Sequence, residues 1–343
     1  MGVPLMSGLP RNLIYQDDTQ PGYFRKKWGR GHTYLDNNVK LTTTETLDWL
    51  RTLRIPPDWD NVWISKNPNG HLLATGYDAK GRKQYYYHPL WSEYRNQAKF
   101  AKLKSFGMAL PLLRKQTNKD IARKGWPKEK VLALTVQVLD EYGIRIGNEQ
   151  YKKENRTFGL TTLRRKHLEF EQGTGRLEYK AKSGRYRKVS IKRGQLARLI
   201  KRCSELPGYE IFTYRGEDGK YHQVQSQDVN QYLQQIIGDE FTCKDFRTWY
   251  GTTIAVEKWE EAHQMVEENS RLKLETTLIK LVAKALGNTV SVCRKYYIHP
   301  KVLSAAINND LANYYKRACP SDLKPWQKKN LDETELMVLK IIS

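Results

Sequence analysis

Apolar residues recur at helical spacing along most of the chain after residue 90. The segment Lys128–Tyr142 is apolar on more than one side and stops at Gly143, which predicts a central buried helix. A short helix is expected to begin near Thr289, directly after a glycine stop at Gly287. The same spacing predicts further helices over residues 91–123, 193–203, 226–237, 244–259, 272–286 and 333–342. This part of the chain is therefore expected to be mainly helical.

Shorter β-type runs stand in two places. In the N-terminal third, runs at 62–64, 72–75 and 81–88 are separated by turn signals and follow an amphipathic helix at 43–53. A three-stranded unit is predicted over 167–191, where the second turn puts Lys182 on a tight hairpin tip. We therefore predict an α+β protein, with a small antiparallel β-sheet domain at 1–90. The larger domain, at 91–343, is predicted to be mainly α-helical with a small three-stranded sheet.

The chain carries a large excess of positive charge. Among its 343 residues, 59 lysines and arginines face 37 aspartates and glutamates, which gives a formal net charge of +22. The cations are spread from Arg25 to Lys329 rather than held in one tail. Such a surface suits a polyanion, so nucleic acid is the expected partner. A membrane is a weaker alternative, because no apolar run approaches the ~18 residues of a spanning helix and no lipidation motif is present.

Cysteine usage and the missing motifs limit the chemistry further. Cys203, Cys243, Cys293 and Cys319 are widely spaced, without a Cys-x-x-Cys pair or matching histidines. This argues against disulfides and structural zinc and favours a reducing cytoplasm. The first ten residues carry no cationic and apolar signal segment, so secretion is not expected. There is no Walker loop, Gly-x-Gly-x-x-Gly fingerprint or carboxylate cluster, so no nucleotide, metal or other cofactor is expected.

The run at 81–88 combines cations, an amide and three aromatic side chains. Alternation along a strand places Lys83, Tyr85 and Tyr87 on one face and Gln84 with Tyr86 on the other. Cationic and aromatic groups at a sheet surface suit a phosphate backbone, and a planar amide suits a base edge. The basic composition favours a DNA-contacting strand over a purely structural one.

Two adjacent phenols, Tyr296 and Tyr297, lie in a cluster of cations at the end of the short helix. Upstream, Arg145 stands between two isoleucines after the central helix, and Arg247 is embedded among apolar residues. An arginine in such a place either pairs with a carboxylate or binds a phosphate through two hydrogen bonds. A tyrosine among such cations in a basic chain indicates covalent chemistry on a phosphodiester.

Four segments of the chain resemble type IB DNA topoisomerases. They read GYDAKGRKQYYY at 76–87, IRIGNEQYKKENRTFGLTTL at 144–163, KDFRTW at 244–249 and LGNTVSVCRKYYI at 286–298. Together with the Lys182 hairpin they span residues 76–300, most of the chain. The size is similar to that of the compact bacterial or poxviral members rather than the nuclear enzyme.

The resemblance implies an ATP-independent enzyme that relaxes supercoiled duplex DNA. One strand would be cleaved through a 3′-phosphotyrosyl intermediate, the duplex would rotate, and the strand would be religated. It also implies a C-shaped clamp on DNA, a monomer, and work on the bacterial nucleoid in the cytoplasm. One phosphodiester is exchanged for another, which explains why no ATP motif is needed.

The resemblance also assigns roles to individual residues. Tyr297 would be the nucleophile, selected over Tyr296 by its offset of nine residues from Asn288. The remaining roles are scissile-phosphate binding by Arg145 and Arg247, protonation of the leaving 5′ oxygen by Lys182, and hydrogen bonding to a non-bridging oxygen by Asn288. The positions that match DNA contacts are Arg82, Gln84, Tyr85, Tyr87 and Tyr151, to which the strand pattern adds Lys83.

Two departures from the family pattern leave details open. Poxviral members have histidine where this chain has Asn288, so hydrogen bonding rather than proton transfer is expected there. Ala181 replaces the usual glycine before the hairpin lysine, so Lys180 stays an alternative to Lys182 as the general acid.

Two other functions remain open from the sequence. A site-specific tyrosine recombinase would share the catalytic residues, but recombinases usually carry histidine three residues before the second arginine, where this chain has Lys244. The β-type N-terminal domain also fits a topoisomerase better than a recombinase. The other alternative is a non-catalytic DNA-binding protein, in which Tyr297 is only structural.

Overall fold

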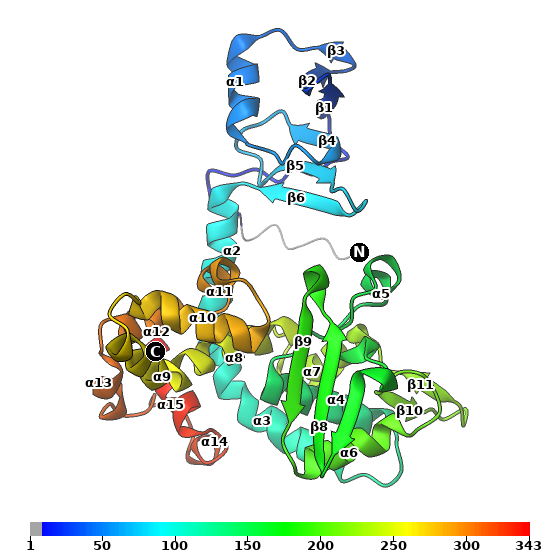
Figure 1. Cartoon of the computed structure of the whole chain (residues 1–343), viewed down its shortest axis with the longest axis vertical. Helices are drawn as coiled ribbons and strands as arrows, with labels where there is room; N and C mark the ends of the chain where they lie inside the picture. The colour runs from blue at the N-terminus through cyan, green and yellow to red at the C-terminus, as the bar shows by residue number, and fades with distance from the viewer. Residues whose placement is uncertain (1–8) are drawn as a thin grey trace. The chain divides into compact units, whose positions relative to one another are not determined.

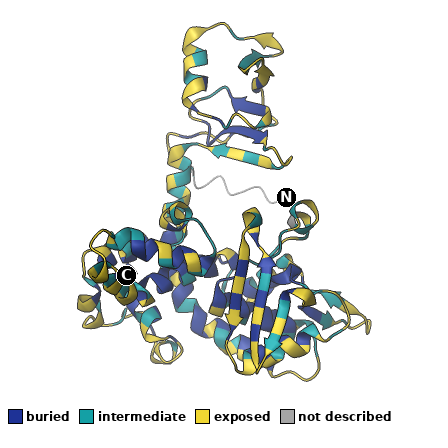
Figure 2. Cartoon of the chain, viewed as in Figure 1, coloured by how far each residue is buried: buried dark blue, intermediate teal, exposed yellow. Residues whose placement is uncertain are grey.

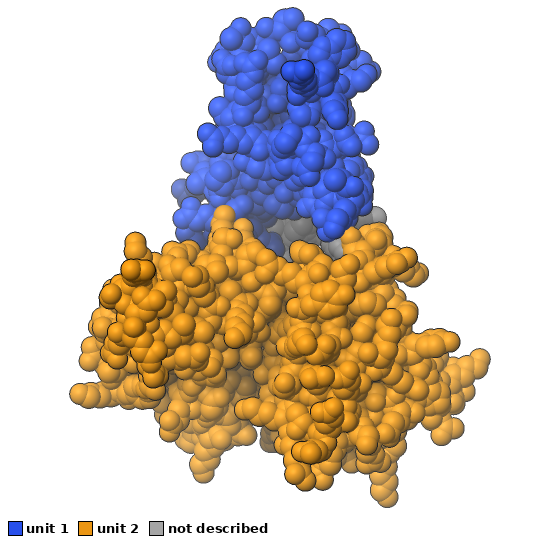
Figure 3. Space-filling view, viewed as in Figure 1, with its two compact units in different colours: residues 1–101 blue, residues 102–343 orange. Residues whose placement is uncertain are grey.

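The chain folds into two units, Met1–Ala101 and Lys102–Ser343, in a computed structural model that describes residues 9–343 (Figure 3). Residues 1–8, where the sequence predicts no secretory signal, lie outside the described residues, so that prediction is not tested. The boundary falls after helix α2 (Pro89–Ala101), so this helix belongs with the β-rich unit. The sequence places the domain boundary before the same helix, at residue 90.

The first unit is built on a six-stranded antiparallel sheet with the order β3-β2-β1-β4-β5-β6 (Figure 1). Helix α1 (Thr44–Thr52) contributes Leu50 to a core shared with Val62 and Ile64. The strands are β1 (Gly22–Trp28), β2 (Gly31–Asp36), β3 (Val39–Lys40), β4 (Asp60–Ser65), β5 (Leu72–Tyr77) and β6 (Lys83–Tyr87). The predicted helix at 43–53 and the three predicted strands are confirmed as α1 and β4 to β6.

Strands β1 to β3 were missed by the sequence prediction, which left residues before 43 without structure. The reason is visible at Arg25, which is buried at a position where a strand pattern normally has an apolar residue. Its guanidinium donates to the carbonyls of Ile55 at 2.9 Å, Pro56 at 2.7 Å and Trp59 at 2.9 Å. These partners lie about thirty residues away along the chain, so local sequence could not indicate the burial.

The second unit is mainly helical and surrounds helix α4 (Lys128–Tyr142), which is buried on most sides (Figure 2). Its other helices are α3 (Leu103–Ile121), α5 (Glu149–Asn155), α6 (Gln195–Ser204), α7 (Ser226–Ile237), α8 (Cys243–Glu257), α9 (Trp259–Glu268), α10 (Leu274–Leu286), α11 (Val290–Tyr296), α12 (Pro300–Ile307), α13 (Leu311–Tyr315), α14 (Pro325–Lys328) and α15 (Glu333–Ile342). The predicted helices at 128–142, 226–237 and 333–342 coincide with α4, α7 and α15. None of the helices within residues 9–343 is long and apolar enough to cross a bilayer.

A three-stranded antiparallel sheet, of β7 (Leu168–Glu171), β8 (Thr174–Lys180) and β9 (Tyr186–Ile191), confirms the predicted β unit. A second, two-stranded sheet of β10 (Thr213–Arg215) and β11 (Tyr221–Gln223) was not predicted. The helical stretch predicted over 91–123 is confirmed, except that it is divided at Lys102 into α2 and α3. At the division, the Lys102 ammonium donates to the Asp245 carboxylate at 2.8 Å and the Glu240 carbonyl at 3.0 Å, which are long-range partners.

A buried charge network ties four helices of the second unit together. Arg114 of α3 donates to the Asp140 carboxylate of α4 at 2.7 Å and to the Glu335 carboxylate of α15 at 2.6 Å. The Trp249 indole of α8 donates to the same Glu335 carboxylate at 3.1 Å. Burial acts to raise the pKa of Glu335, but the hydrogen bonds and charge of Arg114 outweigh it and hold that pKa below its ordinary value.

Removing the cation from this network should be costly. Arg114→Met would leave the Asp140 and Glu335 carboxylates buried without a counter-charge, so we expect the free energy of unfolding to fall by about 3–5 kcal/mol. Denaturant unfolding followed by circular dichroism measures the change. The matched control is Arg51→Met, which removes an exposed pair with Asp48 and should cost less than about 1 kcal/mol. Equal effects of the two substitutions would contradict the network's role.

Candidate active site

The loop after α4 holds Arg145 through backbone contacts. Gly143 ends the helix in the left-handed conformation, with φ of 52°. The Leu160 amide then donates to the Arg145 carbonyl at 2.8 Å. Gly147 and Gly159 allow the two segments to approach, since a Cβ on Gly159 would lie 2.5 Å from the Gly147 Cα atom. The position of Arg145 is therefore set by the backbone rather than by a flexible loop.

The side chain of Arg145 is half-buried and donates to the Asn288 carboxamide oxygen. Burial holds the pKa of Arg145 below its ordinary value, and the positive charge of Arg187 acts in the same direction. Tyr297 acts against this shift. Arg145, Asn288 and Tyr297, which the sequence separates widely, therefore belong to one neighbourhood.

Arg247 lies on α8 and is buried, with 4% of its surface exposed. Its guanidinium donates to the Gly143 carbonyl and, at 2.9 Å, to the Leu286 carbonyl, and it lies 5.2 Å from the ring centroid of Tyr297. Burial, followed by the charges of Arg145 and Arg187, lowers the pKa of Arg247 to about 10. The group therefore stays cationic at neutral pH.

The backbone around Tyr297 directs this phenol toward the arginines. Thr289 caps α11 by accepting from the Val292 amide at 3.2 Å, and the Tyr297 amide at the other end donates to the Cys293 carbonyl at 3.0 Å. Tyr297 is half-buried and packs on the core of the second unit. The neighbouring Tyr296 is exposed, with the Lys295 ammonium 5.5 Å from its ring centroid. The two adjacent phenols thus have different surroundings.

Two small residues of helix α8 pack closely against the backbone of Tyr297. At Gly251 an added Cβ would lie 2.6 Å from the Tyr297 carbonyl oxygen and 3.2 Å from the Tyr297 Cβ atom. The next residue, Thr252, lies with its hydroxyl 3.4 Å from the same carbonyl and accepts from the His299 amide at 3.1 Å. Only glycine permits this approach of helix and tyrosine backbone. Neither residue was singled out by the sequence, which gives no signal for a contact of this range.

The arginines of this neighbourhood lack acidic partners. Among the residues that the structure describes, none of Arg145, Arg187 and Arg247 forms an ion pair with a carboxylate. The Nε atom of Arg247 and the Nδ2 atom of Asn288 are buried, and neither has a hydrogen-bond partner in the described part of the chain. Buried donors normally have partners, and buried cations normally have counter-charges. The arrangement is that of a binding site for an anion.

Arg187, the third arginine of this cluster, was not predicted from the sequence. It lies on β9, where the burial pattern alternates and places Arg187, Val189 and Ile191 inward. The strand period therefore carried the necessary signal, because an inward arginine stands where an apolar residue is expected.

Lys182 forms no hydrogen bond with any of the other four predicted catalytic residues in the described part of the chain. It is exposed at the start of the turn Lys182–Gly184 between β8 and β9 (Figure 1), with Ser183 at φ of 64°. Its ammonium has no hydrogen-bond or ion-pair partner in the described chain, which leaves it available to a ligand. The alternative Lys180 is also exposed, at the end of β8. The tip itself is as predicted.

The predicted DNA contacts of the first unit lie on and beside β6. Lys83, Tyr85 and Tyr87 are exposed, and Tyr86 packs on the core, which confirms the predicted alternation. Lys83 pairs with Asp18 at 2.5 Å, and the rings of Tyr85 and Tyr87 stack with centroids 6.1 Å apart.

Two other predicted contacts share one acidic partner. Arg82 donates to the Asp78 carboxylate at 2.7 Å and Gln84 donates to it at 3.0 Å. These bonds to Arg82 lower the pKa of Asp78 to about 2. Tyr151 belongs to α5, but its side chain lies outside the described residues.

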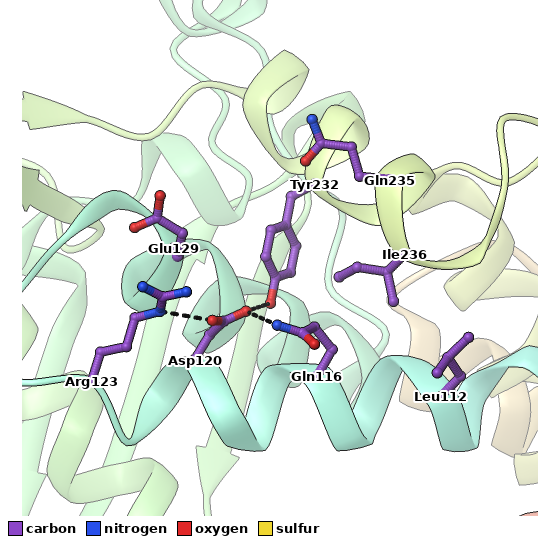
Figure 4. A pocket seen from close by; sticks show the side chains of 8 residues that line it. All are labelled: Leu112, Gln116, Asp120, Arg123, Glu129, Tyr232, Gln235 and Ile236. Atoms are coloured by element: carbon purple, nitrogen blue, oxygen red, sulfur yellow. Dashed lines mark hydrogen bonds and ion pairs between the residues drawn. The ribbon is translucent and has the colours of Figure 1, made fainter.

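A surface pocket of about 420 Å³ lies elsewhere in the second unit (Figure 4). Its lining residues are Leu112, Gln116, Asp120, Arg123, Glu129, Tyr232, Gln235 and Ile236. The Asp120 carboxylate within it already accepts from Gln116 at 2.9 Å, Arg123 at 2.8 Å and Tyr232 at 2.8 Å. It shares no residue with the arginine cluster. Over residues 9–343, no group of three His, Cys, Asp or Glu side chains is arranged to hold a metal ion.

The close approach at Gly251 can be tested by stability. In Gly251→Ala the methyl group would press on the Tyr297 carbonyl and on Leu286, so we expect the free energy of unfolding to fall by about 1–3 kcal/mol. Without the clash, alanine in a helix would instead stabilise by about 1 kcal/mol. Thr253→Ala, on the same helix, is the control. Chemical denaturation measures the free energy of unfolding of both variants. If Gly251→Ala is more stable than wild type, the contact with Tyr297 is not tight.

Comparisons with known proteins agree with the geometry. The family model described as eukaryotic DNA topoisomerase I, catalytic core, matches residues 83–318, and that described as bacterial DNA topoisomerase IB, N-terminal domain, matches residues 31–78. DNA topoisomerase 1B of Acanthamoeba polyphaga mimivirus is 33% identical over 297 residues, covering 84% of this chain and 88% of that protein. DNA topoisomerase 1B of Vaccinia virus (strain Copenhagen) and DNA topoisomerase I of Monkeypox virus are each 25% identical over 283 residues.

These matches cover the regions that carry the site. The catalytic-core match includes the arginine cluster, the Lys182 hairpin and Tyr297, and the viral relatives align over most of both chains. The chain belongs to the type IB DNA topoisomerase family.

Proposed function

We propose that this protein relaxes supercoiled duplex DNA without ATP, by cleaving one strand through a 3′-phosphotyrosyl intermediate, letting the duplex rotate, and resealing the strand. The observation that carries the proposal is the cluster of arginines beside Tyr297 without carboxylate partners. A scissile phosphate would supply the negative charge that the cluster lacks.

In the proposed cleavage step the Tyr297 phenol oxygen attacks the scissile phosphorus. A bond forms between this oxygen and phosphorus, and the bond from phosphorus to the 5′ oxygen breaks. The phenol loses its proton, and the 5′ oxygen gains one. In resealing, the 5′-hydroxyl attacks and the phenolate leaves, which is easier than the departure of an alkoxide. The count of phosphodiester bonds is unchanged, so no external energy source is required.

The buried donors are proposed to bind the non-bridging oxygens, where negative charge grows in the transition state. Arginine side chains are not deprotonated in proteins, so Arg145 and Arg247 carry positive charge. The unpartnered Nε of Arg247 and Nδ2 of Asn288 offer further hydrogen bonds. Preorganised donors of this kind typically stabilise such charge by several kcal/mol. The current bond between Arg145 and the Asn288 oxygen leaves the Asn288 amide nitrogen for the phosphate.

Lys182 is proposed to protonate the leaving 5′ oxygen. Its free ammonium on an exposed hairpin tip can approach a bound duplex, whereas the buried arginines are already positioned. In this view the proton donor joins the site only when DNA is bound. A general acid in this role contributes about 10²–10⁴ in rate.

The exposed face of β6 is proposed to bind the duplex through Lys83, Tyr85 and Tyr87, with Arg82, Gln84 and Tyr151 as further contacts. The net charge of +22 supports phosphate binding over a wide surface. We further propose that the protein acts as a monomer on nucleoid DNA in the cytoplasm. The four free cysteines, of which three are buried, support a reducing compartment.

The choice of nucleophile gives a direct test. With supercoiled plasmid, without ATP or magnesium, wild type should form a 3′-phosphotyrosyl adduct and relax the plasmid. Tyr297→Phe should lose both, because the attacking oxygen is gone, while DNA retention is kept. Tyr296→Phe is the matched control and should retain adduct formation within about tenfold, since its ring lies outside the arginine cluster. Denaturing electrophoresis of labelled DNA measures the adduct.

Three outcomes would contradict the proposal, each in a different way. Adduct formation by Tyr297→Phe at the wild-type level would exclude this tyrosine. DNA retention without any adduct from wild type would favour a non-catalytic DNA-binding protein. Strand exchange only between defined sites would instead indicate a recombinase.

The proton donor can be tested through the leaving group. Lys182→Ala should slow single-turnover cleavage by about 10²–10⁴-fold. Replacing the bridging 5′ oxygen by sulfur should restore the rate, because a thiolate leaves without a proton. Lys180→Ala is the control and should behave like wild type on both substrates. If instead Lys180→Ala is slow and rescued by sulfur, Lys180 is the general acid.

A further inference from the structure

Arg187 is a buried arginine for which the proposed mechanism has no role. It lies on β9 with 7% of its surface exposed. Its guanidinium donates to the Tyr142 carbonyl at 3.0 Å and to the carbonyls of Ala285 and Leu286, each at 3.3 Å. Both terminal nitrogens are therefore used by backbone oxygens, and the side chain has no acidic partner among residues 9–343.

The three carbonyls belong to two helix ends. Tyr142 is the last residue of α4, and Leu286 is the last residue of α10. Both helices end at a left-handed glycine, Gly143 and Gly287 respectively. The last carbonyls of a helix lack intrahelical donors and carry partial negative charge, so a guanidinium is a favourable partner.

Each of these helix ends leads directly into a proposed phosphate-binding residue. Arg145 follows Gly143 by two positions, and Asn288 follows Gly287 immediately. Arg145 and Asn288 are hydrogen-bonded to each other across this junction. The relative position of the two helix ends therefore sets the relative position of the two side chains.

Arg247, on helix α8, also forms hydrogen bonds with the backbone at the ends of α4 and α10. It donates to the Gly143 carbonyl after α4 and to the Leu286 carbonyl of α10, so Leu286 accepts from both Arg187 and Arg247. Two guanidinium groups thus share one acceptor, one from strand β9 and one from helix α8. If either arginine were removed, the ends of α4 and α10 could move apart, and the other arginine would lose its position.

We propose that Arg187 is a positioning residue of the catalytic centre, which fixes the ends of α4 and α10 so that Arg145, Asn288 and Arg247 are spaced for one phosphate. This inference rests on the proposed function. Arg187 acts through the other residues rather than on the substrate, since its terminal nitrogens are occupied and it is buried. Arg185, the residue directly before β9, adds a bond to the Asn288 carbonyl at 3.2 Å.

The test measures single-turnover cleavage at saturating enzyme and, separately, DNA affinity in a Tyr297→Phe background. Arg187→Gln should slow cleavage by about 10²-fold, because small displacements of catalytic groups have effects of that size. DNA affinity should change by less than about threefold, since Arg187 is buried and its terminal nitrogens are bonded to backbone carbonyls. Lys188→Gln, the adjacent exposed residue that pairs with Glu178, should match wild type in both measurements.

Arg187→Lys separates positioning from charge and from stability. Lysine keeps the positive charge but has no planar fork for carbonyls on two helices, so about a tenfold loss of rate should remain. This conservative variant also serves if Arg187→Gln fails to fold. In an Arg247→Ala background, where the junction is already released, Arg187→Gln should cost less than about threefold.

The assignment would be overturned by a wild-type cleavage rate in Arg187→Lys, or by equal losses in the wild-type and Arg247→Ala backgrounds. It would also fail if the loss in Arg187→Gln followed DNA affinity alone. The Arg187 variants are compared with the wild-type protein, whose adduct formation must depend on Tyr297. Absence of that adduct from wild type would refute the proposed function itself, whereas reactive wild type with equally reactive Arg187 variants refutes only the positioning role.

Discussion

The binding of helix-terminal carbonyls by buried guanidinium groups is the interaction on which the candidate site depends. The ends of α4 and α10 meet because Arg187 and Arg247 each donate hydrogen bonds to backbone carbonyls at both ends, and the Leu286 carbonyl accepts from both. Such oxygens satisfy the hydrogen-bonding geometry of arginine but provide only partial negative charge. The cluster therefore keeps its excess positive charge in a buried setting, which is the physical basis for the proposed binding of a phosphate.

The two phenols at the end of α11 show how close packing distinguishes chemically identical groups. Tyr297 is held by backbone contacts with Gly251 and Thr252 of α8, and its ring faces Arg247. Tyr296 projects outward with a lysine beside it. Both side chains are surrounded by cations in the sequence, yet only one lies at the buried arginines. The contacts with α8 and Arg247 thus give a physical basis for the preference for Tyr297 that the family resemblance implies.

The fixed arginines and the exposed hairpin suggest a division of labour within the proposed reaction. Groups that stabilise charge on phosphorus are held by helices and backbone bonds, where they need no rearrangement. The proposed proton donor lies on a two-stranded tip whose lysines have no partner in the described chain. Leaving-group protonation would then depend on DNA being bound. The buried network of Arg114, Asp140 and Glu335 contacts the same helices, α4 through Asp140 and α8 through Trp249.

The sequence by itself determined the long helices, the three-stranded unit and the family, because periodicity and local motifs are encoded by neighbours along the chain. It indicated Tyr297, Arg145, Arg247, Asn288 and Lys182 through the resemblance. Strands β1 to β3 were not predicted, since the buried Arg25 of β1 has its hydrogen-bond partners, three backbone carbonyls, in a distant segment. Only the tertiary structure decided that Arg187 joins two helix ends and that Gly251 receives Tyr297. Both depend on contacts between residues far apart in the chain, which no local pattern records.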